Sequence, residues 1–244
     1  MLEKPENTKR GFNLSKDFLT DLPLYDITKF TTLDFQENLA CIFWFCKCNM
    51  RCPYCYNTPI VFGDGTTSLQ DALNFLKTRQ NRLTGVVLSG GECTLYPHLK
   101  ELCQEIKNLG FKIKIDTNGT NPTLMKDLVE NQLVDYIALD YKAPKEKFEE
   151  ITKNKNFDNF ERTLDYLIQK DFAFEARTTV HSNLLDTDDI NFIIDDLHKR
   201  NYTKIYYLQN YLHVDDTVGK IEAQKKPIDT KKINQKIKVS FREF

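Results

Sequence analysis

The feature that most restricts the fold of this chain is a repeated pairing of a short apolar segment with a longer amphipathic one. Six segments of five to eight residues are largely apolar and rich in β-branched and aromatic side chains, which is typical of buried strands. They cover residues 39–45, 85–89, 111–116, 134–140, 173–180 and 204–209. Amphipathic stretches predict helices between them, at residues 68–78, 97–109, 121–130, 156–170 and 187–200.

This alternation predicts parallel βαβ units with right-handed crossovers, and therefore an α/β fold with a barrel-like sheet. Periodicity alone does not distinguish six strands from eight. No seventh repeat follows Asn210, so we expect a partial (β/α)6 barrel of parallel strands, similar to a TIM barrel. A further short strand is predicted over residues 30–35, where polar and apolar residues alternate. A solvated helix face is predicted for the lysine-rich tail at Lys225, Lys226, Lys231, Lys232, Lys236 and Lys238.

Composition indicates a globular protein with one core. Apolar residues make up 41% of the chain, and no apolar run has the length or the charged flank of a membrane span or signal peptide. Seven cysteines without an export signal indicate reduced thiols and a cytoplasmic protein. The net charge of −1 gives no electrostatic reason to expect binding to nucleic acid or to a membrane. We expect a leader at residues 1–29, a core at 30–212 and a C-terminal extension at 213–244 that docks on the core.

Three cysteines follow the first strand in a Cys-x3-Cys-x2-Cys run, formed by Cys48, Cys52 and Cys55. A four-iron cube usually takes four thiolates, so a loop with three holds three irons and leaves the fourth open. An open metal position is the mark of a catalytic site. The alternative is zinc, but no second Cys-x2-Cys or His pair completes a zinc ribbon. We expect packing roles or bystander thiols at Cys41, Cys46, Cys93 and Cys103.

Polar residues end all six predicted strands, where function collects in a barrel of parallel strands. Gly90 and Gly91 follow the second strand, and glycine lets a ligand approach the backbone closely. The carboxylate of Glu92 beside exposed carbonyls suits an ammonium group, although two glycines also make an ordinary turn. Asp116 and Asn118 end the third strand in Asp-Thr-Asn-Gly, which is a turn sequence as well.

Together these motifs resemble the radical S-adenosylmethionine (SAM) enzymes, and within them the glycyl-radical-enzyme activases of anaerobic ribonucleoside-triphosphate reductase. The resemblance covers about residues 30–210. It is carried by Phe30-Thr-Thr-Leu-Asp34, Cys48-Asn-Met-Arg-Cys-Pro-Tyr-Cys55, Leu88-Ser-Gly-Gly-Glu92, Asp116-Thr-Asn-Gly119 and Arg177-Thr-Thr-Val180. It implies SAM and one [4Fe-4S] cluster with three cysteine ligands as cofactors.

The resemblance also implies roles for other side chains at the strand ends. Tyr54 would lie near the adenine, and Gly90, Gly91 and Glu92 would hold the SAM amino group. Asp116 would contact the cofactor or the active-site loop, Asn118 would contact the cofactor, and Lys142 would reach toward SAM.

Arg177 lies inside an apolar strand, where a buried guanidinium needs an anion. That anion is either the SAM carboxylate or a structural aspartate. His181 and Gln209 are candidate contacts to the ribose or the carboxylate, or are polar residues satisfied within the protein.

In the implied reaction, a reduced cluster passes one electron to SAM, and the resulting 5′-deoxyadenosyl radical takes a hydrogen from a glycine of the partner. The implied partners are the glycine-bearing loop of the anaerobic ribonucleotide reductase large subunit and a flavodoxin- or ferredoxin-type electron donor. Two alternatives stay open. One is a radical SAM enzyme that acts on a small molecule or peptide, such as a deazapurine synthase, and the other is a zinc-binding module.

Overall fold

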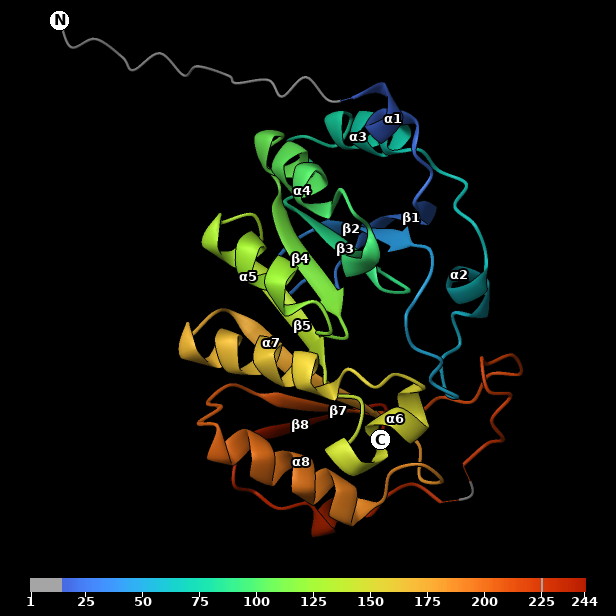
Figure 1. The fold of residues 1–244 in the computed structure, drawn as a ribbon, viewed down its shortest axis with the longest axis vertical. Helices are drawn as coiled ribbons and strands as arrows, with labels where there is room; N and C mark the ends of the chain where they lie inside the picture. The colour runs from blue at the N-terminus through green and yellow to red at the C-terminus, as the bar shows by residue number, and fades with distance from the viewer. Residues whose placement is uncertain (1–14, 225) are drawn as a thin grey trace, which may run out of the picture.

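The computed structural model describes residues 15–224 and 226–244. These residues form one eight-stranded sheet in the order β1 to β8, with β1 antiparallel to β2 and all later neighbours parallel (Figure 1). Edge strands β1 and β8 do not pair with each other, so the barrel is open. The strands are β1 Leu24–Thr31, β2 Ala40–Phe45, β3 Gly85–Gly90, β4 Lys112–Thr117, β5 Tyr136–Asp140, β6 Phe174–Val180, β7 Tyr206–Asn210 and β8 Val239–Arg242.

Helices connect the parallel strands and lie along the outside of the sheet (Figure 1). Their ends follow local capping chemistry: the Ser68 side chain accepts a hydrogen bond from the Asp71 N–H, and Asp186 and Asp189 form a reciprocal capping box. The α-helices are α1 Lys16–Thr20, α2 Thr58–Phe62, α3 Leu69–Lys77, α4 Leu99–Asn108, α5 Pro122–Glu130, α6 Lys145–Thr152, α7 Phe157–Gln169 and α8 Thr187–Lys199. Short 3-10 helices are η1 Cys93–Leu95 and η2 Thr230–Lys232.

The two faces of the sheet differ in chemistry. Side chains that face the helices, such as Phe43, Leu88 and Ile115, belong to the main apolar core. The inner face has a separate apolar cluster that includes Ile42 and Val87 near the amino ends of the strands. Toward the carboxyl ends the inner residues become polar and are less completely buried, namely Ser89, Asp116, Asp140, Arg177, Thr179 and Gln209. Polar groups therefore gather at the end of the barrel where the cysteine loop also lies.

The six predicted strands are confirmed as β2 to β7, but the prediction of a strand over residues 30–35 was wrong. Strand β1 ends at Thr31, and bends and turns follow. The reason is local: the Thr31 hydroxyl donates to Asp34 at 2.5 Å and accepts from the Leu33 N–H at 3.2 Å, so it competes with strand pairing. Phe35 then packs into the inner apolar cluster.

The lysine-rich tail is not an α-helix, which corrects the second local prediction. Its described part is irregular except for η2, and the Asn234 N–H donates to Asn191 on α8 at 2.8 Å. Lys236 pairs with Asp195 on the same helix at 2.8 Å. Pro227 cannot donate a backbone hydrogen bond, which disfavours a helix through this segment. The tail then adds β8 to the sheet without a crossover helix.

Part of the expected leader is docked on the core. Ser15 caps α1, Phe18 is buried, and β1 belongs to the main sheet. The first 14 residues of the expected leader, and Lys225 of the tail, lie outside the described residues.

Candidate cluster and cofactor site

The three motif cysteines lie on the loop between β2 and α2, at the carboxyl end of β2. Lys47 has φ 70°, which turns the chain out of the strand. Its N–H donates to Ile60 O at 2.9 Å, and its carbonyl accepts from the Glu92 N–H at 2.9 Å. The Cys55 N–H donates to Cys52 O at 3.0 Å and closes a turn between these two cysteines. We refer to residues 46–57 as the cysteine loop.

Gly90 and Gly91 make this loop possible. Gly90 has φ 120°, and a Cβ there would lie 2.4 Å from the backbone of Phe45. A Cβ on Gly91 would lie 1.9 Å from Lys47 O. The close approach that we predicted for a ligand is therefore made by the backbone of β2 and the cysteine loop.

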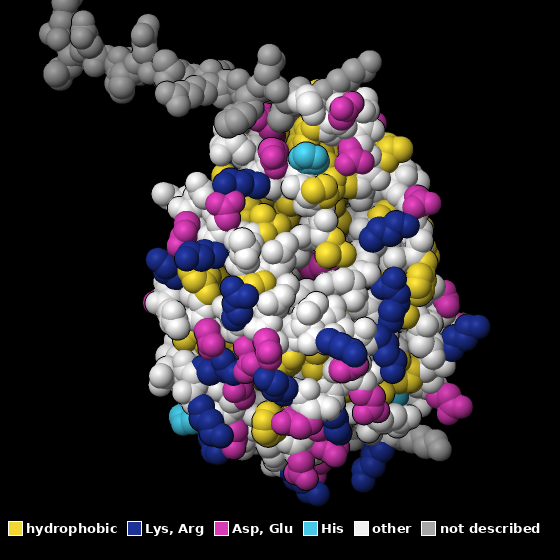
Figure 2. Space-filling view, viewed as in Figure 1, with side chains coloured by type: hydrophobic (Ala, Val, Ile, Leu, Met, Phe, Trp, Pro, Cys, Tyr) yellow, Lys and Arg dark blue, Asp and Glu magenta, His cyan; other side chains and the backbone are white. Residues whose placement is uncertain are grey.

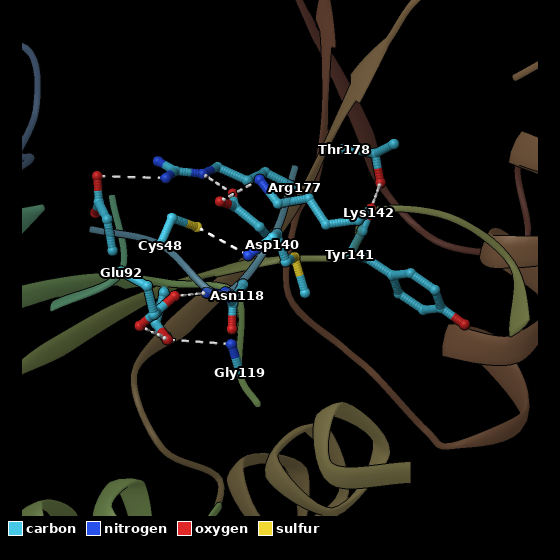
Figure 3. Close-up of polar contacts among 12 residues, drawn as sticks. Cys48, Glu92, Asn118, Gly119, Asp140, Tyr141, Lys142, Arg177 and Thr178 are labelled. Atoms are coloured by element: carbon cyan, nitrogen blue, oxygen red, sulfur yellow. Dashed lines mark hydrogen bonds and ion pairs between the residues drawn. The ribbon is translucent and has the colours of Figure 1, made fainter. Parts of the chain in front are cut away.

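The Cys48 and Cys52 thiols are protonated in the metal-free protein. Burial, followed by the nearby Glu92 carboxylate, raises the pKa of Cys48 to about 12, and burial also raises the pKa of Cys52. The Met50 N–H donates to Cys48 Sγ at 3.3 Å (Figure 3). A bound metal takes thiolates, so loading this site releases protons.

The donor set fits an iron–sulfur cube better than a single zinc ion. Among the described residues, no three His, Cys, Asp or Glu side chains come close enough to hold one metal ion, as tetrahedral zinc requires. A cube binds each thiolate to a different iron, so its three cysteines need not converge on one point. All three are free thiols on one loop, and Cys48 and Cys55 are half-buried.

Glu92 is buried and holds neighbouring backbone and hydroxyl groups (Figure 3). Its Oε1 accepts from the Thr94 N–H at 3.2 Å, the Thr94 hydroxyl at 2.6 Å and the Thr117 hydroxyl at 2.8 Å. Among the described residues, the donor to its Oε2 is the Asn118 N–H, at 2.7 Å. Burial raises the pKa of Glu92, and these hydrogen bonds counteract part of that effect. One acceptor position on Oε2 remains for an ammonium group.

A chain of alternating charges crosses the inner face from β4 to β6 (Figure 3). Arg177 Nε donates to Asp140 Oδ1 at 2.5 Å, and Arg177 Nη2 lies 3.3 Å from Asp116 Oδ2. Lys142 pairs with Asp140 at 2.9 Å, and Lys114 pairs with Asp116 at 3.0 Å. Burial alone would raise the pKa of Asp140, but Arg177 and Lys142 outweigh it and lower that pKa to about 2. The structural ion pair that we considered for Arg177 is thus present.

This network has one uncompensated positive charge. Lys114, Lys142 and Arg177 contribute three cations, and Asp116 and Asp140 contribute two carboxylates. Because all five side chains are at most 21% exposed, a further anion would be only weakly screened by water. The arrangement can accept a carboxylate beside the cysteine loop.

Comparisons with known proteins identify the family. The model of the radical SAM superfamily matches residues 42–197, which include the cysteine loop and strands β3 to β6. The chain belongs to the radical SAM superfamily. This membership implies a [4Fe-4S] cluster and SAM as cofactors. The free thiols of Cys48, Cys52 and Cys55 on one loop are a suitable donor set for such a cluster.

Relatives of this radical SAM protein have different activities. A Methanocaldococcus jannaschii protein, provisionally named a glycyl-radical enzyme activating enzyme, is 31% identical over 178 residues, which are 68% of this chain and 72% of the relative. The 7-carboxy-7-deazaguanine synthase of Neisseria meningitidis is 35% identical over 97 residues, covering 40% and 41% of the two chains. Streptococcus suis SuiB bound to S-adenosylmethionine superposes with a TM-score of 0.62 at 14% identity, over 82% of this chain and 51% of SuiB. That similarity shows the fold.

The other predicted cofactor contacts of the radical SAM protein are placed as follows. Tyr54 is buried beside Cys52, and burial raises its pKa well above the ordinary value, so it is a neutral phenol. His181 is buried, with Nε2 2.9 Å from Glu222 O and Nδ1 accepting from the Asn183 N–H at 3.2 Å, so the protein satisfies both nitrogens. Gln209 is half-buried on β7 and pairs in register with Arg242 on β8.

Sequence reasoning missed several groups that hold the cysteine loop. Asn118 Nδ2 donates to Asn49 Oδ1 at 2.7 Å, and Asn49 Nδ2 donates to Thr120 Oγ1 at 2.8 Å. From the C-terminal extension, the Val218 N–H donates to Cys55 O at 2.8 Å and the Gly219 N–H to Pro53 O at 3.1 Å. Asn118 was predicted as a cofactor contact and not as a partner of the loop. The other residues have no sequence signal, because isolated Asn, Thr and Gly residues are common in loops.

No helix in the described part of the chain is long and apolar enough to cross a membrane. Figure 2 shows acidic and basic side chains intermingled over one face of the molecule. That face therefore has no broad area of one charge sign, as expected from the net charge of −1.

Proposed function

We propose that the protein is a radical SAM activase that installs a glycyl radical on an anaerobic ribonucleoside-triphosphate reductase. Support comes from the motifs at the strand ends and from the Methanocaldococcus relative provisionally named a glycyl-radical enzyme activating enzyme. The residues proposed to act are the three cysteines as cluster ligands and the charged groups of the inner face as SAM contacts. A flavodoxin- or ferredoxin-type protein would supply the electron.

The observation that carries this proposal is that the cysteine loop and the uncompensated cation of the inner face occupy the same end of the barrel. Cys48, Cys52 and Cys55 would anchor the cluster. The SAM carboxylate would bind near Arg177 and Lys142, and its ammonium group would use the remaining acceptor position of Glu92. These two contacts would fix the methionyl group and hold the reacting bond in one orientation.

The reaction balances with one electron from the external donor. Cys48, Cys52 and Cys55 would hold the cluster, which would supply one-electron chemistry for reductive cleavage of SAM. That cleavage breaks the bond between sulfur and C5′ and gives methionine and a carbon radical on the 5′-deoxyadenosyl group. Hydrogen-atom transfer from a glycine Cα of the reductase then gives 5′-deoxyadenosine and the glycyl radical. The protein's own part is to orient SAM and keep other hydrogen donors away.

An open sheet suits a macromolecular substrate. The inner residues at the carboxyl ends are only partly buried, and β1 and β8 leave the barrel unclosed. A small-molecule enzyme usually encloses its ligand in a concave pocket. We propose that the face around Cys48, Glu92 and Asp116 receives the glycine-bearing loop, with residues 210–244 contacting the partner's surface.

The test is an anaerobic mixture of reduced protein, SAM and the cognate reductase, followed by electron paramagnetic resonance (EPR) spectroscopy. We expect a glycyl-radical doublet on the reductase and one 5′-deoxyadenosine per radical. The control is reductase whose radical glycine is replaced by alanine, which should give no doublet. SAM cleavage without a doublet in the complete mixture would refute the proposed partner.

A second candidate is a radical SAM enzyme that acts on a small molecule. The similarity to the Neisseria 7-carboxy-7-deazaguanine synthase favours it, although that similarity covers only 40% of this chain. This function predicts that a nucleobase-like compound, and not a protein, stimulates formation of 5′-deoxyadenosine.

A further inference from the structure

The peptide unit between Asn49 and Met50 is bound at both of its polar ends. Its carbonyl accepts a hydrogen bond from Asn154 Nδ2 at 3.0 Å. Its N–H donates to Cys48 Sγ at 3.3 Å. Because a peptide unit is planar, with its C=O and N–H on opposite sides, a group that fixes the carbonyl also aims the N–H. By fixing the Asn49 carbonyl, Asn154 therefore also fixes the direction in which the Met50 N–H donates to Cys48 Sγ.

Asn154 is itself held in one orientation. It is 7% exposed, its Oδ1 accepts from the Asn156 N–H at 2.8 Å, and its own N–H donates to Thr152 Oγ1 at 3.1 Å. With the oxygen committed to a donor, the Nδ2 must face the Asn49 carbonyl. The loop that carries Asn154 is joined to the cysteine loop a second time, because the Arg51 N–H donates to Thr152 O at 2.7 Å.

The side chain of Asn49 is fixed independently. Asn118 donates to Asn49, Asn49 donates to Thr120, and the Thr120 hydroxyl donates back to Asn118 Oδ1 at 2.7 Å, which closes a ring of three hydrogen bonds. The side chain of Asn49 is thus bound to the end of β4 while its carbonyl is bound to Asn154. These contacts leave the Asn49–Met50 peptide little freedom to rotate.

We propose that Asn154 is a positioning residue that aims the Met50 N–H at the Cys48 sulfur and thereby favours the reduced form of the cluster. This inference rests on the proposed binding of a [4Fe-4S] cluster by Cys48. Hydrogen bonds to cluster sulfurs are among the factors that set the reduction potential, because they stabilise the additional negative charge of the reduced state. Removing the Asn154 amide leaves the peptide free to turn away from the sulfur.

The test compares wild-type holoprotein with the Asn154→Ala and Asn159→Ala variants in an EPR-monitored redox titration without SAM. Asn159 is a suitable control, because it also donates from a nearby side-chain amide, to Thr120 O at 3.3 Å, but does not contact the Asn49–Met50 peptide. For Asn154→Ala we expect the ratio of oxidised to reduced cluster at a fixed potential to rise about three- to tenfold. For a one-electron couple a tenfold change corresponds to 59 mV, so this change equals a midpoint reduction potential that is lower by about 30–60 mV. Equal midpoints in all three proteins would overturn the proposal.

A second measurement decides the matter if Asn154→Ala does not retain a cluster. The chain has three methionines, so selective ¹⁵N-methionine labelling isolates the amide of Met50 from nearly all other signals. In the metal-free protein we expect faster hydrogen exchange at Met50 in Asn154→Ala than in wild type or Asn159→Ala. Met125, which is buried in α5, should be unchanged. Unchanged hydrogen exchange at Met50 would refute the proposal that Asn154 fixes the Asn49–Met50 peptide. Neither measurement involves the reductase, so a failed activase assay would not change the result or the interpretation of either one.

Discussion

Replacing Glu92 by glutamine should lower the free energy of unfolding by about 2–4 kcal/mol. The carboxylate accepts four hydrogen bonds from buried donors, three on Oε1 and one on Oε2. An amide retains one acceptor oxygen. If that oxygen keeps the three contacts of Oε1, the new NH₂ group faces the Asn118 N–H, which then has no acceptor. The opposite orientation is worse, because the NH₂ group would then face three donors.

The magnitude follows from the lost contact. A hydrogen bond to a charged group contributes about 1.5–3 kcal/mol, and a buried donor without a partner adds about 1–3 kcal/mol. Part of that cost is offset, because burial raises the pKa of Glu92 and the neutral amide avoids burying a charge. The matched control is Glu130→Gln on α5, an exposed residue whose ion pair with Lys126 measures 3.8 Å. Such a surface change should alter stability by at most about 0.5 kcal/mol.

The assay is urea unfolding of the metal-free proteins under reducing, anaerobic conditions, monitored by circular dichroism. We expect a lower midpoint for Glu92→Gln, an unchanged slope, and no effect for Glu130→Gln. If the unfolding free energy of Glu92→Gln lies within about 0.5 kcal/mol of wild type, the four hydrogen bonds to Glu92 do not stabilise the protein by the expected amount.

Three further results are expected. Cys52→Ala should lose the cluster absorbance and SAM cleavage after reconstitution, whereas Cys103→Ala should keep both, and a normal cluster in Cys52→Ala would overturn the ligand assignment. Arg177→Met should weaken SAM binding about ten- to a hundredfold in equilibrium binding, as expected for a lost charge-assisted contact. Despite burial, ion pairs lower the pKa of Asp140 from 3.8 to about 2, so its stabilisation is present above pH 3.8 and is lost as the pH falls through 2. In Asp140→Asn, the loss of unfolding free energy between neutral pH and pH 2 should therefore be smaller than in wild type by about 2 kcal/mol.

Strands β2 to β7 could be predicted because the pattern that identifies them is local. Each is a short apolar run, and an amphipathic helix separates most of them from the next strand. Strand β8 lacks that signal: η2 and irregular chain precede it, and it has only four residues, Val239–Arg242. It forms because β7 offers a free parallel edge, with Tyr206 opposite Val239. Such a pairing depends on the finished sheet and not on the local sequence.

The position of the site could also be predicted, since the carboxyl ends of parallel strands meet at one end of a barrel. The hydrogen-bond partners of each side chain could not be predicted. Glu92 and Asn118 are 26 residues apart, and Asn49 and Asn154 are 105 residues apart. A Gly-Gly-Glu sequence indicates a close approach but does not say whether a ligand or the chain makes it. Here Lys47 O occupies the space that a side chain at Gly91 would need.

The contacts of Val218 and Gly219 with the cysteine loop determine when, during synthesis of the chain, that loop can be completed. Their two hydrogen bonds, to Cys55 O and Pro53 O, join residues separated by more than 160 positions. A chain is made from its N-terminus at about 5–20 residues per second, so the cysteines leave the ribosome roughly 8–30 seconds before the segment that packs against them. During that interval the thiols belong to an incomplete barrel. The proposed insertion of a cluster at Cys48, Cys52 and Cys55 into the finished loop would therefore follow the synthesis of residues 218 and 219.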